Sequence, residues 1–90
     1  MELFETSEIV SSKEKLTEIK ELILYNDDVN TFEHVIKALV EICDHELIQA
    51  EQCTFIVHTK GKCIIKNGIL NELLKFKNSL QQRGLTVAIK

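Results

Sequence analysis

The chain has 90 residues, which is enough for one compact core but leaves no room for a second lobe enclosing a deep cleft. Its content of 44% hydrophobic and 28% charged residues is ordinary for a soluble globular protein, and no apolar run approaches the roughly 20 residues needed to span a bilayer. The net charge of −3 argues against nonspecific nucleic-acid binding, which needs a basic face, and is compatible with a cationic partner.

Residues 1–20 mix charged and apolar side chains without a clean period, and we expect them to form a flexible N-terminal extension. The alternative is that part of this segment packs on the domain as an extra strand or helical turn. The first ten residues are acidic and lack the basic start and long apolar stretch of a secretory signal, so we expect a cytoplasmic location.

Residues 21–26 predict the first strand, and their continuous apolarity favours a central or covered position in a sheet. A polar turn follows, and apolar side chains then recur at helical spacing from Phe32 to Cys43. We expect Asn30 to cap this helix, with Glu33 reaching back as in a capping box.

Asp44 breaks the first helical pattern and is expected to cap a second helix over residues 45–59, which Gly61 ends. One side of this second helix carries residues that we expect to be buried. They are Leu47, Ile48, Ala50, Cys53, Thr54, Ile56 and Val57.

The last third of the chain predicts a strand over residues 62–66, a turn at 67–68, a helix over 69–83 that Gly84 terminates, and a strand over 85–89. The whole order is therefore β-α-α-β-α-β. In a chain of this length, three strands and three helices most naturally form an α+β domain with a three-stranded antiparallel sheet and the helices on one face.

The polar turn after the first strand makes a corner rich in hydrogen-bond acceptors, which suits a cation with several N–H donors. Asn26, Asp27 and Asp28 lie in this corner, although such residues can also serve only as a turn and cap. His58 lies near the end of the second helix, one turn after Thr54, and could offer a lone pair or simply contact the last carbonyls. Asn26, one aspartate and His58 could together accept from the three donors of an ammonium, supplied by a lysine or by a free α-amino group.

Side chains on the two helices that flank this corner could line an apolar cavity beside it, although each could equally be plain core. The candidates are Phe32, Val35, Leu39, Thr54 and Val57.

The three cysteines, Cys43, Cys53 and Cys63, are an odd number with no C-x-x-C pair, and we expect them to be reduced residues of the core. A zinc site with histidines or a catalytic cysteine paired with a histidine remains as an alternative, although the spacings match no common motif. The chain has no Gly-rich phosphate-binding loop, so nucleotide binding has no support. We also predict no cofactor, no metal and no catalytic group.

Two stretches, LILYNDDVNTFEHVI and QAEQCTFIVHTKGKC, resemble the ClpS family, the adaptors of the bacterial Clp protease that recognise N-end-rule substrates. The motifs are NDD between a strand and a helix, and V-H-x-x-G-K at the end of the second helix. The resemblance covers about residues 21–90, which would be the adaptor domain. It implies the fold derived above, which is also similar to the C-terminal domain of the ribosomal stalk protein.

The resemblance further implies that a bulky N-terminal residue of another protein (Leu, Phe, Tyr or Trp) binds in a small apolar pocket. Asn26, an acidic residue of the pair Asp27 and Asp28, and His58 would hold its free α-amino group, with Asp28 our first choice for the direct contact. The alternative function is a stalk-like module that docks a protein partner and has no such pocket.

The family's N-terminal extension engages a ClpA or ClpC unfoldase, a role that residues 1–20 fit. The unfoldase's N-terminal domain would dock on the folded part, where Lys62 and Glu72 are candidates. Phe32 stands where the family commonly has a methionine that guards the pocket against β-branched residues, and Thr54 stands where an apolar residue is often found. Both departures bear on which N-terminal residues are accepted.

Overall fold

The computed structural model describes residues 17–90, so most of the extension predicted for residues 1–20 lies outside the described residues. The elements in chain order are β1 (Lys20–Tyr25), α2 (Phe32–Cys43), α3 (Leu47–Lys60), β2 (Lys62–Gly68), α4 (Leu70–Gln82) and β3 (Thr86–Ile89). This order confirms the predicted β-α-α-β-α-β arrangement and the α+β fold.

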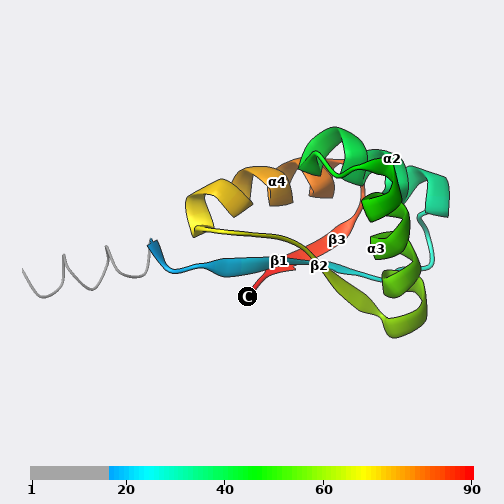
Figure 1. The fold of residues 1–90 in the computed structure, drawn as a ribbon, viewed down its shortest axis with the longest axis horizontal. Coiled ribbons are helices and arrows are strands. Elements are labelled where there is room, and N and C mark those ends of the chain that lie inside the picture. Colours follow the sequence, from blue (N-terminus) through cyan, green and yellow to red (C-terminus); the bar gives the residue numbers. More distant parts are fainter. Residues whose placement is uncertain (1–16) are drawn as a thin grey trace, which may run out of the picture.

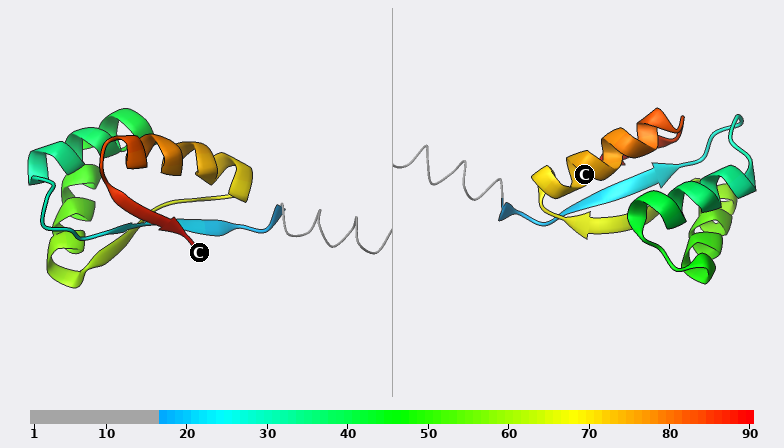
Figure 2. Two further views of the ribbon diagram at one scale, coloured as in Figure 1. Left: turned by 180° about the vertical axis from the view of Figure 1, so that it is seen from behind. Right: turned by 90° about the horizontal axis from the view of Figure 1, so that it is seen from above.

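The three strands form one antiparallel sheet in the order β2-β1-β3, so of the two predicted positions for the first strand, central or covered, it takes the central one. Figure 1 shows the three helices on one face of this sheet. Figure 2 shows α2 and α3 together near the end of β1 that leads into α2, while α4 lies along the sheet, where it contacts all three strands.

The core fills the space between the sheet and the helices. Leu22 and Leu24 of β1 are buried, as are Leu39 of α2 and Leu73 and Leu80 of α4. Leu39 and Cys43 share one face of α2, and Leu73 and Leu80 share one face of α4, as burial of one side of a helix requires. In β1 the residue between the two leucines, Ile23, is also buried, as expected for a central strand.

The predicted turn at Asn67–Gly68 is wrong, because both residues continue β2 and pair with Glu21 and Lys20 of β1. An Asn-Gly pair forms a hairpin turn where it joins two strands. Here a helix follows, so the backbone of this pair is free to bond to the start of β1. The register shifts between Leu22 and Ile23, where a β-bulge interrupts the ladder.

The predicted burial of α3 is right on one side of the helix and wrong on the other. Ala50, Cys53, Thr54 and Val57 are buried against α2 and β2. The remaining apolar residues of the prediction face outward, with exposed fractions of 60% for Leu47, 66% for Ile48 and 40% for Ile56. Apolar residues lie all round α3, and only one face of a helix can meet the core.

Two capping predictions are also wrong. Thr31, not Asn30, caps α2, because its Oγ1 accepts the backbone N–H of His34 at 3.1 Å. Asp44 does not cap α3, whose N-cap is Glu46. Asp44 instead ends α2 in the left-handed conformation (φ 61°), which aspartate tolerates better than most residues, and its N–H donates to the Leu39 carbonyl.

Candidate functional site

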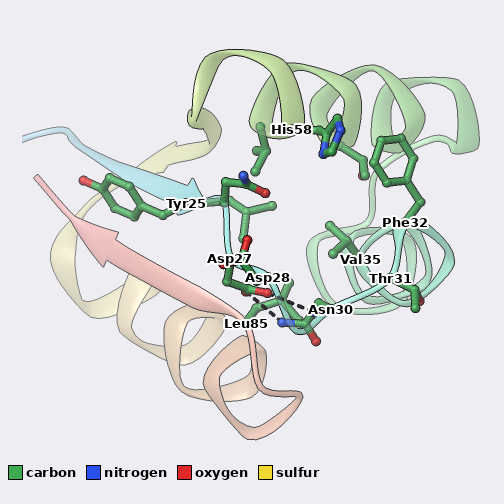
Figure 3. Close-up of a pocket in the computed structure, with 13 residues that line it drawn as sticks. Tyr25, Asp27, Asp28, Asn30, Thr31, Phe32, Val35, His58 and Leu85 are labelled. Atoms are coloured by element: carbon green, nitrogen blue, oxygen red, sulfur yellow. Dashed lines mark hydrogen bonds between the residues drawn. The ribbon is translucent and has the colours of Figure 1, made fainter.

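A hollow of about 340 Å³ opens between the end of β1, the start of α2 and the last turns of α3 (Figure 3). Its size lies at the lower end of the range for small-ligand sites in proteins. The hollow is lined by Leu24, Tyr25, Asn26, Asp27, Asp28, Asn30, Thr31, Phe32, Val35, Thr54, Val57, His58 and Leu85.

Asp27 anchors the polar turn that forms one wall of the hollow. One carboxylate oxygen accepts the backbone N–H groups of Val29 and Asn30, each at 2.9 Å, and the other accepts the Asn30 side-chain amide at 2.8 Å. These donors, the Asn30 N–H first among them, hold the pKa of the Asp27 carboxyl below its ordinary value. Both carboxylate oxygens of Asp27 are therefore already hydrogen-bonded within the turn.

The turn is also tied to the loop between α4 and β3. The Asn30 amide donates a second hydrogen bond to the Gly84 carbonyl at 3.0 Å. Nearby, an imidazole N–H of His34 donates to the Arg83 carbonyl at 2.7 Å, and the Arg83 guanidinium contacts Glu41 at 2.6 Å. Asn30 of the turn and two side chains of α2, His34 and Glu41, thus hold the segment that follows α4.

Asn26 and Asp28 contribute acceptors that the protein leaves unused. The backbone N–H of Asn26 donates to the Gly61 carbonyl at 2.9 Å, which fixes the turn against the end of α3. Within residues 17–90, neither the Asn26 amide nor the Asp28 carboxylate has a hydrogen-bond or ion-pair partner. Both side chains are exposed, so an incoming donor can reach them.

His58 lies across the hollow from the aspartate turn, in the last turn of α3 (Figure 3). Its ring meets the Phe32 ring edge to face, with centroids 5.2 Å apart and planes at 77°. This contact orients the imidazole. In the described part of the chain no hydrogen bond reaches either ring nitrogen, so a neutral His58 has a free lone pair for a ligand.

The remaining lining is largely apolar. Phe32, Val35, Thr54 and Val57 all border the hollow, as the sequence predicts for each. The Thr54 hydroxyl donates to the Ala50 carbonyl at 2.7 Å, so its donor is satisfied without a ligand. Leu39, which the sequence placed in this cavity, does not border the hollow; it is 0% exposed and lies in the core.

Sequence reasoning missed several lining residues, namely Leu24, Tyr25, Asn30, Thr31 and Leu85. The first four adjoin the recognised motif and could have been found from it. Leu85 lies beside the hollow because β3 pairs with β1, with Thr86 opposite Tyr25, and because Gly84 is bound to Asn30, 54 positions away; no local pattern shows these contacts.

The two candidate unfoldase contacts lie outside the hollow, on exposed positions of other elements: Lys62 begins β2 and Glu72 is in the first turn of α4. Cys43 and Cys53 are free thiols in the core, where burial raises the pKa to about 11 for Cys43 and to about 12 for Cys53. Neutral thiols are poor nucleophiles.

Across residues 17–90 no group of three or more His, Cys, Asp and Glu side chains is placed to hold a metal ion. Nor does any helix there have the length and apolarity of a membrane span.

Comparison with known proteins finds a family and a solved structure that match this chain. The family model described as "ATP-dependent Clp protease adaptor protein ClpS" matches residues 16–88. Among solved structures, Agrobacterium tumefaciens ClpS2 bound to L-phenylalaninamide superimposes with a TM-score of 0.70 at 12% sequence identity, covering 82% of this chain and 96% of that chain. At that identity the structural match shows a shared fold. Comparison with curated proteins gave no match.

Proposed function

Because this chain belongs to the ClpS family, we propose that it is an adaptor that binds proteins bearing a bulky hydrophobic N-terminal residue and delivers them to a Clp unfoldase. One observation carries the proposal: the unused acceptors of Asn26, Asp28 and His58 all border one apolar hollow. The accepted N-terminal residues would be Leu, Phe, Tyr and Trp. The protein would act in the cytoplasm as a binding module and not as an enzyme.

The polar rim suits an α-ammonium group, which has one positive charge and three N–H donors. The Asp28 carboxylate would supply the charge-assisted bond, and the Asn26 amide oxygen and the neutral His58 imidazole would accept the remaining donors. Asp27 would contribute to the local negative potential and not to direct contact, because its oxygens are already bonded within the turn. An acetylated terminus has lost the charge and all but one donor, so in the complex it would cover these acceptors and leave most of them unpaired.

The apolar lining suits the first side chain of the bound protein. Burying one Leu or Phe side chain adds about 1.5–3 kcal/mol, and each charge-assisted hydrogen bond contributes about 1.5–3 kcal/mol. Because association has its own cost, we expect modest affinity, micromolar or somewhat better.

Phe32 would restrict which N-terminal residues enter. It borders the hollow and packs on His58, so it has less freedom to move aside than an unpacked side chain. We propose that it excludes β-branched Ile and Val, whose extra bulk lies next to the ammonium group.

Delivery would use surfaces away from the hollow. Residues 1–20 would engage the translocating unfoldase of the ClpA or ClpC type, and its N-terminal domain would dock near Lys62 and Glu72. Both side chains are exposed and leave the hollow open, so substrate and unfoldase could bind together.

Fluorescence anisotropy with labelled peptides tests the proposal. Peptides that begin with Phe or Leu should bind, whereas the same peptides acetylated, or beginning with Met, should bind at least tenfold more weakly. Equal binding of all of them would overturn the proposal. His58→Ala should weaken binding of the Phe peptide and lower the melting temperature only slightly, because the imidazole makes no hydrogen bond within the described chain and loses only its edge-to-face contact with Phe32. His34→Ala is the matched control for replacing a histidine near the turn, and it should lower the melting temperature because His34 binds the Arg83 carbonyl.

A further inference from the structure

The outward face of α3 carries an apolar surface that nothing in the described chain covers. Phe55 is 60% exposed and Ile48 is 66% exposed, although both are large apolar residues. Together with Glu51, Gln52 and Ile56 they line a shallow recess of about 350 Å³, which we call the α3 recess. Large apolar side chains grouped on a surface commonly mark a binding site.

The α3 recess adjoins the hollow that the proposed function assigns to the N-terminal residue. α3 supplies Thr54, Val57 and His58 to the hollow, and Phe55 and Ile56 to the recess. Successive helical residues are separated by about 100°, so Phe55 lies about 60° round the helix from His58 and one turn earlier. A chain that leaves the hollow past His58 can therefore continue directly onto Phe55.

We propose that the α3 recess binds an apolar side chain of the same substrate, a few residues after its N-terminal residue. This inference rests on the proposed function and narrows its substrate class to N-terminal segments with a second apolar residue downstream. The middle of the recess lies about six helical residues before His58, or about 9 Å along the axis. With the sideways step round the helix, an extended chain at about 3.3 Å per residue reaches it at about the fourth to sixth position.

The size of the α3 recess favours a tethered segment over a second copy of the chain. Stable association of two proteins needs about 800 Å² of buried surface on each partner, far more than one shallow recess with a few exposed side chains provides. A segment already held by its α-amino group has a high effective concentration at the recess, so even a weak contact adds to affinity. Glu51 at the edge of the recess additionally favours neutral or basic neighbours over acidic ones in the bound segment.

The test is a set of peptides that begin with Phe and continue with Ser and Gly, in which a single Leu is moved through positions 2 to 8. Anisotropy should show binding about three- to tenfold tighter when the Leu is near positions 4 to 6 than when it is absent, as expected for partial burial of one side chain. In Phe55→Gln this preference should disappear while the Leu-free peptide binds as before. Leu74→Gln is the control: it replaces a partly exposed apolar residue of α4 that borders neither the hollow nor the α3 recess, and it should keep the preference.

The outcomes separate this inference from the proposed function. If the Leu-free peptide binds but the position of Leu has no effect, or if Phe55→Gln keeps the preference, the inference is overturned and the proposed function stands. If peptides that begin with Phe do not bind at all, both fail. A concentration-dependent dimer in sedimentation that Phe55→Gln abolishes, with no effect on peptide binding, would assign the recess to a second copy and also overturn the inference.

Discussion

Replacing Asp27 or Asp28 by alanine should separate folding from binding at two adjacent carboxylates. The side chain of Asp27 accepts three hydrogen bonds within the turn, whereas that of Asp28 has no partner within residues 17–90. Asp27→Ala should therefore act mainly on stability, and Asp28→Ala mainly on the binding of an α-ammonium group.

The magnitudes follow from these contacts. Hydrogen bonds to a charged group contribute about 1.5–3 kcal/mol each when fully formed, but the turn is only partly buried, and screening by water reduces the total loss for Asp27→Ala to about 1–2 kcal/mol. For a domain of this size that loss lowers the melting temperature by about 5–15 °C. Asp28→Ala should change stability by no more than about 0.5 kcal/mol. Its loss of one charge-assisted bond to the ligand should weaken peptide binding by about ten- to a hundredfold.

Thermal melts by circular dichroism and anisotropy with a peptide beginning with Phe measure both quantities on the same samples. Glu33→Ala is the matched control, since Glu33 is an exposed carboxylate in the first turn of α2 that does not border the hollow. Equal losses of stability in the Asp27 and Asp28 variants would refute the division of roles. So would unchanged peptide affinity in Asp28→Ala.

Three further predictions concern other contacts of the fold. Asn30→Ala removes the side-chain hydrogen bonds to Asp27 and to the Gly84 carbonyl, so the free energy of unfolding measured in urea should fall by about 1–2 kcal/mol. Anisotropy should show several-fold weaker peptide binding. If neither quantity changes, the turn and the loop are not coupled through Asn30. The pKa of Asp27 is lower in the folded protein than in the unfolded chain, so its ionised carboxylate stabilises the fold at pH values above the unfolded-state pKa. The difference in unfolding free energy between the wild type and Asp27→Asn should therefore shrink as the pH falls below about 4. A difference in urea melts that does not change with pH would contradict this prediction. The thiols of Cys43 and Cys53, whose pKa values burial raises, should react with a disulfide reagent at pH 8 only after unfolding, and rapid labelling of the native protein at either position would show that they are accessible.

Much of the fold could be predicted from local patterns because each helix and strand has a recognisable hydrophobic pattern within its own residues. Alternation and helical spacing, together with Gly61 and Gly84 at positive φ after their helices, are sufficient to give the order and type of the six elements. The errors lie where two local solutions are equally good. Asn30 and Thr31 are both good helix caps, and the choice fell to Thr31 because Asn30 is held by the distant Gly84 carbonyl.

The candidate site was predictable where it is built from one contiguous motif and less so elsewhere. The polar turn, Phe32 and Val35 lie within ten residues of each other, and His58 follows at a fixed helical position. The residue pattern does not show which of the two aspartates is free, since that depends on which carboxylate folds back onto the N–H groups of the turn; only the family resemblance favours Asp28 for direct contact with a ligand. The outward face of α3 was missed for a related reason: apolar residues on both sides of a helix do not reveal which side meets the core.

The way the sheet ends has a practical consequence for labelling and immobilisation. Lys90 and Glu21 exchange backbone hydrogen bonds, each at 2.9 Å, so Lys90 is held beside the first residues of β1. The opposite end of β1 carries Tyr25 and the hollow, about 13 Å further along the strand. A fluorophore or affinity tag joined after Lys90 would therefore lie at the end of β1 opposite the hollow. A protein coupled to a surface through this tag would still expose the hollow to solution.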